Sequence, residues 1–221
     1  MRRNASIAAL LILIGAGAVA CGGSPPPPPP PPVVEDTPAP DPDSIAAALA
    51  AEREAAAMQL CEQAAEAVAA GDVNRARSLV QEINRDYAGT ECASMVAGIT
   101  AKIDAIVVLR ERVNFEFDRS RITDEAAAIL QRKADVLREH PDLRISIEGH
   151  CDERGSLEYN MALGQRRAQS TLQYLTGLGI SGDMFTTVSY GEERPVAQGA
   201  NEGAWAQNRR AEFVIGNVDA L

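Results

Sequence analysis

The feature that most constrains the fold is a change of hydrophobic period within residues 143–175. Leu143, Ile145 and Ile147 alternate with polar residues, which predicts a strand with one buried face. From Met161 onward apolar residues recur at helical spacing, which predicts a helix packed on a sheet. The polar loop between them, residues 149–155, lies where binding groups are common. The sequence therefore predicts a strand–loop–helix unit with a candidate site in its loop.

Four polar or apolar side chains could gather beside this loop. Asn160, Leu163 and Arg167 share one helical face, offset from the buried stripe, and Asp152 precedes the same helix. Two interpretations stay open at this point. Asp152 and Arg167 are a solvent-exposed ion pair that contributes little stability, or they hold a ligand that carries both an ammonium and a carboxylate.

Motifs spread in order over the last half of the chain resemble one known family. They are Phe115-Glu116-Phe117-Asp118, Gly149-His150-Cys151-Asp152-Glu153-Arg154-Gly155, Tyr159-Asn160, Leu163-Gly164-Gln165-Arg166-Arg167-Ala168, Tyr190-Gly191-Glu192-Glu193-Arg194-Pro195 and Asn208-Arg209-Arg210. Together they resemble the OmpA-like peptidoglycan-binding domains, and within that family the Pal-type lipoproteins.

The resemblance implies a binding function without cleavage. The ligand would be the diaminopimelate side chain of the peptidoglycan stem peptide, with Asp152 accepting from its ammonium and Arg167 pairing with its carboxylate. The pocket would be completed by Asn160, Leu163, Phe117, Asp118, Gly149 and His150. Arg209 and Arg210 would brace the domain or the pocket. The alternative is that they lie exposed to solvent at the beginning of a strand.

Residue 151 departs from the family pattern, which usually has Thr where this chain has Cys151. A thiol is a weaker hydrogen-bond partner than a hydroxyl, so some affinity is in doubt if that group contacts ligand or backbone. A Cys–His nucleophile or a metal site at His150 and Cys151 is disfavoured, because neighbours on a strand point to opposite faces. We expect no enzyme activity, no cofactor and no metal.

The rest of the C-terminal half predicts the remaining sheet. Alternating residues indicate strands at 113–118, 185–190 and 211–215, and Thr123 caps a further helix that ends at His140-Pro141. Two helices on one face of a four-stranded mixed sheet form an α+β fold, which we assign to residues 111–221.

Residues 44–110 predict an all-α helical module. Three antiparallel helices are expected at Ile45–Ala70, Val73–Tyr87 and Glu91–Leu109, with Ser44 and Asp72 as N-caps. Folding back between them brings Cys92 within about one helical turn of Cys61. A Cys61–Cys92 disulfide is therefore expected in an oxidising compartment. Metal binding by these two cysteines is the less favoured interpretation, because no His neighbours them in the sequence.

The N-terminal region has the pattern of an exported lipoprotein. A short basic start precedes an apolar run, Ile7 to Ala20, that is shorter than the roughly 20 residues of a membrane-spanning helix, so residues 1–20 are interpreted as a signal peptide. Ala18-Val19-Ala20-Cys21 resembles a lipobox, which predicts acylation of Cys21; otherwise cleavage leaves a free N-terminal Cys. Residues 21–43 form a Pro-rich linker whose run Pro25–Pro32 excludes helix and sheet.

The formal charge of −10 argues against nucleic acid as a partner, because phosphate binding depends on basic surface. The expected function is an outer-membrane lipoprotein that faces the periplasm and binds peptidoglycan, in partnership with the Tol system during cell division as the resemblance implies. The alternative is a periplasmic helical scaffold that binds protein partners through residues 44–110.

Overall fold

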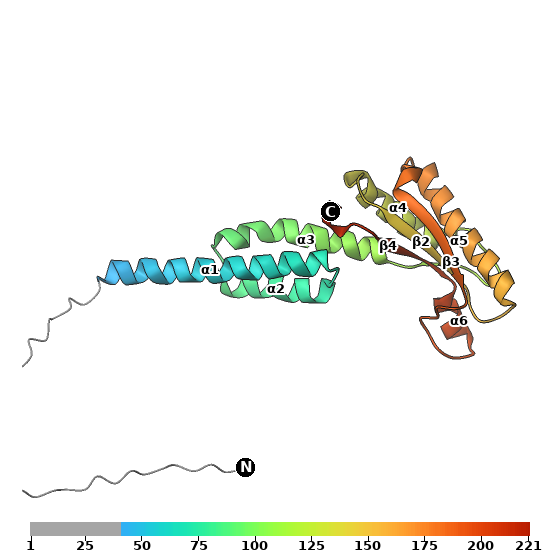
Figure 1. Ribbon diagram of the computed structural model, residues 1–221, viewed down its shortest axis with the longest axis horizontal. Coiled ribbons are helices and arrows are strands. Elements are labelled where there is room, and N and C mark those ends of the chain that lie inside the picture. The colour runs from blue at the N-terminus through green and yellow to red at the C-terminus, as the bar shows by residue number, and fades with distance from the viewer. Residues whose placement is uncertain (1–40) are drawn as a thin grey trace, which may run out of the picture. The chain divides into compact units, whose positions relative to one another are not determined.

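The computed structural model describes residues 41–221, which form one compact unit (Figure 1). The expected signal peptide, the lipid site at Cys21 and the proline run at 25–32 lie outside the described residues.

Three helices open the described chain: α1 (Pro42–Ala69), α2 (Val73–Asp86) and α3 (Glu91–Arg110). Asp72 caps α2 as expected, by accepting a hydrogen bond from the backbone N–H of Arg75. The cap expected at Ser44 is wrong: α1 begins at Pro42 and Asp41 is its N-cap. Proline suits the first turn of a helix, where its missing N–H would have no partner, so the helix extends into the last residues of the expected linker.

The three helices pack side by side around small and branched side chains, among them Ala57, Ala64, Ile83 and Ile103 (Figure 1). Cys61 and Cys92 form the expected disulfide between α1 and α3, with a Cα–Cα distance of 5.9 Å. Among the described helices, α3 alone is long and apolar enough to cross a membrane. Its residues Val96, Ile99, Ile103 and Ile106 pack in the core of this module.

The C-terminal domain is a four-stranded mixed sheet in the order β1-β4-β2-β3. Its strands are β1 (Val113–Asn114), β2 (Ile145–His150), β3 (Phe185–Gly191) and β4 (Arg210–Ile215). β2 runs parallel to β3 and antiparallel to β4, so that Ile147 lies beside Thr187 on one side and Phe213 on the other. The expected α+β fold is confirmed.

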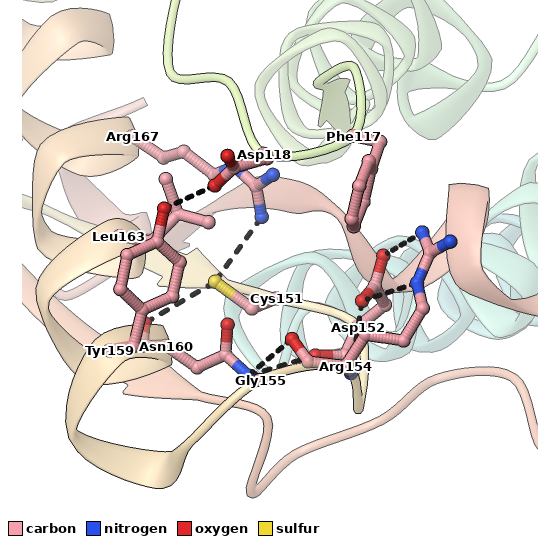
Figure 2. A pocket seen from close by; sticks show the side chains of 10 residues that line it. All are labelled: Phe117, Asp118, Cys151, Asp152, Arg154, Gly155, Tyr159, Asn160, Leu163 and Arg167. Atoms are coloured by element: carbon pink, nitrogen blue, oxygen red, sulfur yellow. Dashed lines mark hydrogen bonds and ion pairs between the residues drawn. The ribbon is translucent and has the colours of Figure 1, made fainter.

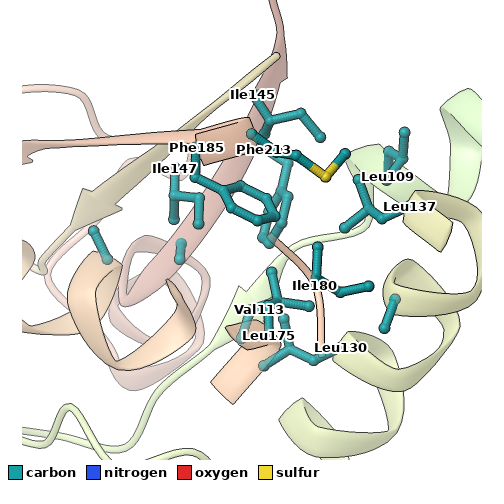
Figure 3. Packing of buried hydrophobic residues seen from close by; sticks show 14 of the residues in the cluster. Leu109, Val113, Leu130, Leu137, Ile145, Ile147, Leu175, Ile180, Phe185 and Phe213 are labelled. Carbon is teal, nitrogen blue, oxygen red and sulfur yellow. The ribbon is translucent and has the colours of Figure 1, made fainter. Parts of the chain in front are cut away.

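Two long helices, α4 (Asp124–Glu139) and α5 (Leu157–Gly177), cover one face of this sheet. Leu130, Leu137 and Leu175 meet Ile147 and Phe213 in a single apolar core (Figure 3). Thr123 caps α4 as expected, and Ser156 caps α5. Three short helices were not expected: η1 (Gly182–Met184), α6 (Glu202–Asn208) and η2 (Val218–Ala220).

The first strand is much shorter than its alternating pattern predicts. Only Val113 and Asn114 pair as strand, although the backbone N–H of Phe115 still donates to the carbonyl of Arg209 at 2.9 Å. The chain then turns, and the N–H of Arg119 bonds the carbonyl of Glu116. Asp118 has a positive φ of 55°, a conformation that no strand contains. This turn forms one rim of the candidate site.

The end of α3 is bound by α4. Lys133, fully buried, donates from Nζ to the carbonyls of Val108 and Leu109 at 2.9 and 2.6 Å, and it lies over the ring of Phe213. These carbonyls belong to the last turn of α3, where the helix can no longer bond them in its regular pattern; the carbonyl of Val108 also accepts from the N–H of Glu111. Leu109 itself belongs to the core of the C-terminal domain. The helical module and the sheet domain are therefore joined by buried contacts.

Candidate functional site

A cavity of about 240 Å³ lies where β2 ends and α5 begins, beside the turn after β1. Pockets for drug-sized ligands measure roughly 300–1,000 Å³, so this cavity suits a single amino-acid side chain. Figure 2 shows its lining residues, which are Phe117, Asp118, Cys151, Asp152, Arg154, Gly155, Tyr159, Asn160, Leu163 and Arg167. The turn, the loop and the helix that the sequence singled out thus meet at one hollow.

The helix face that carries Asn160, Leu163 and Arg167 is buried. Their exposed fractions are 1%, 5% and 0%, whereas Met161, which we expected in the buried stripe, is exposed. Asp152 is also buried, at 4%. The interpretation of Asp152 and Arg167 as a solvent-exposed ion pair is therefore wrong.

Asn160 positions the loop. Its side-chain amide donates to the backbone carbonyls of Asp152 and Arg154, both at 3.2 Å, and to the carboxylate of Glu192. Gly155 has a φ of +119°, a conformation that favours glycine, and it allows the loop to enter α5. This arrangement aims the side chains of residues 152 and 154 at the cavity.

Both carboxylate oxygens of Asp152 accept hydrogen bonds from arginine residues. Its Oδ1 accepts from the backbone N–H and the Nε of Arg154, both at 3.1 Å, and its Oδ2 accepts from Arg154 Nη2 at 2.7 Å and Arg209 Nη1 at 3.3 Å. Burial alone would raise the pKa of Asp152, but these hydrogen bonds outweigh it and lower the pKa below its usual value. The carboxylate is therefore ionised at neutral pH.

Arg167 does not pair with Asp152. Its Nε donates to the carbonyl of Arg119 at 2.9 Å, its Nη1 to the carbonyl of His150 at 2.7 Å and its Nη2 to the carbonyl of Glu116 at 3.2 Å. Burial lowers the pKa of Arg167. The guanidinium thus fixes the two backbone segments that frame the cavity and leaves few of its five N–H groups for a ligand.

Cys151 lies under the cavity with 3% of its surface exposed. Its thiol donates to the carbonyl of Asn160 and accepts from Arg167 Nη1, both at 3.3 Å. Burial raises the pKa of this thiol to about 11. Because the thiolate is the reactive form of cysteine, Cys151 is poorly suited to act as a nucleophile at neutral pH.

Two expected site residues do not line the cavity. A Cβ at Gly149 would lie 1.9 Å from the carbonyl oxygen of Gly164, so this glycine permits close packing of β2 against α5. His150 is buried, stacks on Tyr190 and contributes to the site only through its carbonyl, which Arg167 binds. Burial, reinforced by nearby arginines, lowers the pKa of His150 to about 4, so its ring is neutral.

Among the described residues, one group offers metal-ligand atoms close together. Atoms of Glu148, His150 and Glu212 lie within 4.8 Å of one another. However, Glu212 already binds Arg210 at 2.7 Å and Arg112 at 2.9 Å. With Arg194 also near Glu148, the positive charges outnumber the carboxylates, which disfavours a cation here.

The sequence analysis placed Arg154 in a motif without giving it a role, and it did not single out Trp205. The guanidinium of Arg154 lies over the rings of Phe117 and Trp205, 3.9 and 4.1 Å from their centroids. Arg209, expected to brace the domain or the pocket, is buried and bonds Asp152, Glu202 and the carbonyl of Phe115. Trp205 is the chain's single tryptophan, and that rarity was the available signal.

Comparison with known proteins assigns the family. The OmpA family model matches residues 114–209. The peptidoglycan-associated lipoprotein of Rhizobium meliloti is 41% identical over 138 residues, which are 62% of this chain and 78% of that protein. The protein of the same name from Haemophilus influenzae is 42% identical over 131 residues, which are 58% of this chain and 82% of that protein.

Among solved structures, the peptidoglycan-associated lipoprotein from Burkholderia pseudomallei is 43% identical and has a TM-score of 0.48, covering 50% of this chain and 92% of that chain. The identity shared with the two relatives extends over more than three quarters of each relative's length. The chain therefore belongs to the family of peptidoglycan-associated lipoproteins and carries an OmpA family domain.

Proposed function

We propose that this chain is an outer-membrane lipoprotein that binds peptidoglycan non-covalently through the diaminopimelate side chain of the stem peptide. The observation that carries the proposal is the cavity itself, because a buried carboxylate, Asp152, and a buried guanidinium, Arg167, line one hollow of side-chain size. A zwitterionic side-chain end needs both charges in one place.

In this arrangement the ligand's ammonium would approach the carboxylate of Asp152. Its carboxylate would meet the positive field of Arg167 and the backbone amides of Phe117 and Asp118 at the turn. Asn160 and Leu163 would hold the loop and the wall of the cavity. The positive φ of Asp118 supports this assignment, since strained backbone is concentrated at binding sites.

The names of the relatives support the wider setting. Acylated Cys21 would anchor the chain, and the Pro-rich segment up to residue 40 would separate the anchor from the folded unit. We extend the proposal to tethering of the outer membrane to the wall and to a partnership with the Tol system in cell division.

The test is co-sedimentation of the full chain, solubilised in detergent, with purified insoluble peptidoglycan. Wild type is expected to sediment, and Asp152→Ala and Arg167→Ala are expected to stay in solution. Arg144→Ala is the matched control, because it removes an exposed arginine at the other end of β2. Circular dichroism checks that each variant is folded. Wild type that stays in solution, or folded site variants that sediment as well as wild type, would contradict the proposal.

A second function rests on a different surface. The first turns of α1 extend beyond α2 and α3 and expose Ile45 and Leu49 (Figure 1). An exposed apolar helical face suits protein partners, as expected of a periplasmic scaffold. This function would become the main one if wild type failed to sediment with the wall.

A further inference from the structure

Arg154 forms an ion pair with the carboxylate of Asp152, the group that the proposed function assigns to the ligand's ammonium. Three of its N–H groups, including its backbone amide, point at Asp152, and the side chains form a bidentate pair at 3.1 and 2.7 Å (Figure 2). Arg209 adds a further donor to the same carboxylate. An ammonium that approached Asp152 would therefore have to compete with a protein cation already in place.

The two arginines differ in how firmly they are held. Arg209 is 7% exposed, and it also donates to the carbonyl of Phe115 at 3.0 Å and to Glu202 at 2.7 Å. The Arg154 side chain is 30% exposed, and its carboxylate partner within 3.5 Å is Asp152. Arg154 can therefore leave Asp152 while Arg209 remains.

A second carboxylate stands beside Arg154. Glu202, on α6, lies 3.8 Å from Arg154 Nη2, and its side chain is 64% exposed. The guanidinium lies over the rings of both Phe117 and Trp205, 3.9 and 4.1 Å from their centroids, so a short movement from Asp152 to Glu202 can keep these ring contacts. The positive charge then stays paired throughout the exchange.

We propose that Arg154 is a displaceable internal ligand of Asp152, which a ligand ammonium replaces as Arg154 moves to Glu202. This inference rests on the proposed function and adds a residue that sets its specificity. A ligand that lacks the ammonium leaves Arg154 on Asp152. A ligand that carries it must outcompete the bidentate pair, which lowers the affinity for weak or badly aligned amines.

The experiment titrates the full chain in detergent with the tripeptide L-Ala-D-Glu-meso-diaminopimelate and with the same peptide acetylated on its free side-chain amine. Calorimetry gives the Kd, and the emission of Trp205, the single tryptophan, reports the movement of Arg154. The variants are Arg154→Gln and, as a matched loss of one exposed arginine charge, Arg144→Gln.

The free-amine peptide is expected to change the emission of Trp205 in wild type, and the acetylated peptide is expected to leave it unchanged. Arg154→Gln is expected to bind the free-amine peptide about three- to tenfold more tightly, because the competing cation is gone, whereas Arg144→Gln matches wild type.

Folded Arg154→Gln that binds equally or more weakly would overturn the inference, because Arg154 would then support binding. An unchanged wild-type Trp205 emission at saturating free-amine peptide would also overturn it. If Arg154→Gln does not fold, this wild-type measurement alone tests the inference. Wild type that bound neither peptide nor wall would refute the proposed function itself, and the inference with it.

Discussion

Cys151 shows how one buried side chain can be tied into a site without reacting there. The thiol bridges the carbonyl of Asn160 and the guanidinium of Arg167, which links the start of α5 to the loop after β2. A hydroxyl at this position would make the same two contacts with stronger hydrogen bonds. Cys151 in place of the usual Thr therefore weakens the hydrogen bonds that hold the residues beneath the cavity, and it does not change the entrance of the cavity.

The raised pKa of Cys151 predicts slow thiol chemistry. In a Cys21→Ser background Cys151 is the single free thiol, because Cys61 and Cys92 are joined. At pH 8 a pKa of about 11, against an ordinary 9.0, lowers the thiolate fraction roughly 100-fold. We expect Ellman's reagent to label native protein at least about 100-fold more slowly than protein unfolded in urea. Labelling of the native protein at the unfolded rate would show that the thiol is accessible and ionisable.

At the scale of elements, the most consequential contact is between α4 and the end of α3. Lys133 donates to two carbonyls in the last turn of α3, of which that of Val108 also accepts from the N–H of Glu111, and Arg132 beside it forms an ion pair with Glu111 at 2.7 Å. The positive charge also suits the negative end of the α3 dipole. One turn of α4 therefore fixes the position of the preceding helix.

Burial lowers the pKa of Lys133 to about 7, from an ordinary 10.5. Between these two values the unfolded chain binds more protons than the folded chain, so the free energy of unfolding rises with pH. We expect wild type to gain stability from pH 7 to pH 9 in urea titrations, and Lys133→Met to show a smaller rise. Cys151 of the unfolded chain, with its ordinary pKa of 9.0, already ionises within this window and partly offsets the rise, but it does so equally in wild type and in Lys133→Met.

The matched control for this comparison is Arg138→Met, which removes one positive charge from the same helix. Arg138 lies on the exposed side of α4 and pairs with Asp135. Because Arg138→Met leaves Lys133 and its two carbonyl contacts in place, the variant is expected to keep the pH dependence of wild type. Equal pH dependence in wild type and Lys133→Met would show that Lys133 keeps an ordinary pKa in the folded chain.

At the scale of the whole described chain, residues 41–221 contain two apolar cores. One lies among α1, α2 and α3, and the other lies between the sheet and the helices α4 and α5. Leu109 of α3 belongs to the second core, and Ile215, Val218 and Leu221 from the C-terminal end pack against the first. Each core therefore contains or contacts side chains from the other part of the chain.

This sharing of residues predicts a single cooperative unfolding transition. Circular dichroism at 222 nm reports mainly the helices, whereas Trp205 fluorescence reports the C-terminal domain. We expect the two urea midpoints to coincide for wild type. Lys133→Ala removes the two hydrogen bonds from α4 to the last turn of α3, so it is expected to separate the two midpoints. Two distinct midpoints for wild type would show that the helical module and the sheet domain unfold independently.

The sequence by itself determined the long helices and the strands β2, β3 and β4, and it predicted a candidate site in the loop after β2. Hydrophobic periodicity and helix caps are local properties of the sequence. Asp72 and Thr123 were therefore sufficient to predict two helix starts, and the alternating residues of β2 were sufficient to predict a strand. The motif residues Asp152 and Arg167 were identified from their resemblance to a family, and the structure places both at one cavity. The Cys61–Cys92 pairing followed from helix lengths, which fix how far the chain returns on itself.

The tertiary structure alone decided what those side chains bond. Spacing left open whether Asp152 and Arg167 pair with each other or hold a ligand together. In the structure Arg167 donates to backbone carbonyls of two other segments, and Asp152 accepts from Arg154 and Arg209. The early end of β1 had the same cause, because its turn is held by Arg167 from α5. Such choices depend on which donors and acceptors meet in space once burial removes water, and no local pattern encodes that competition.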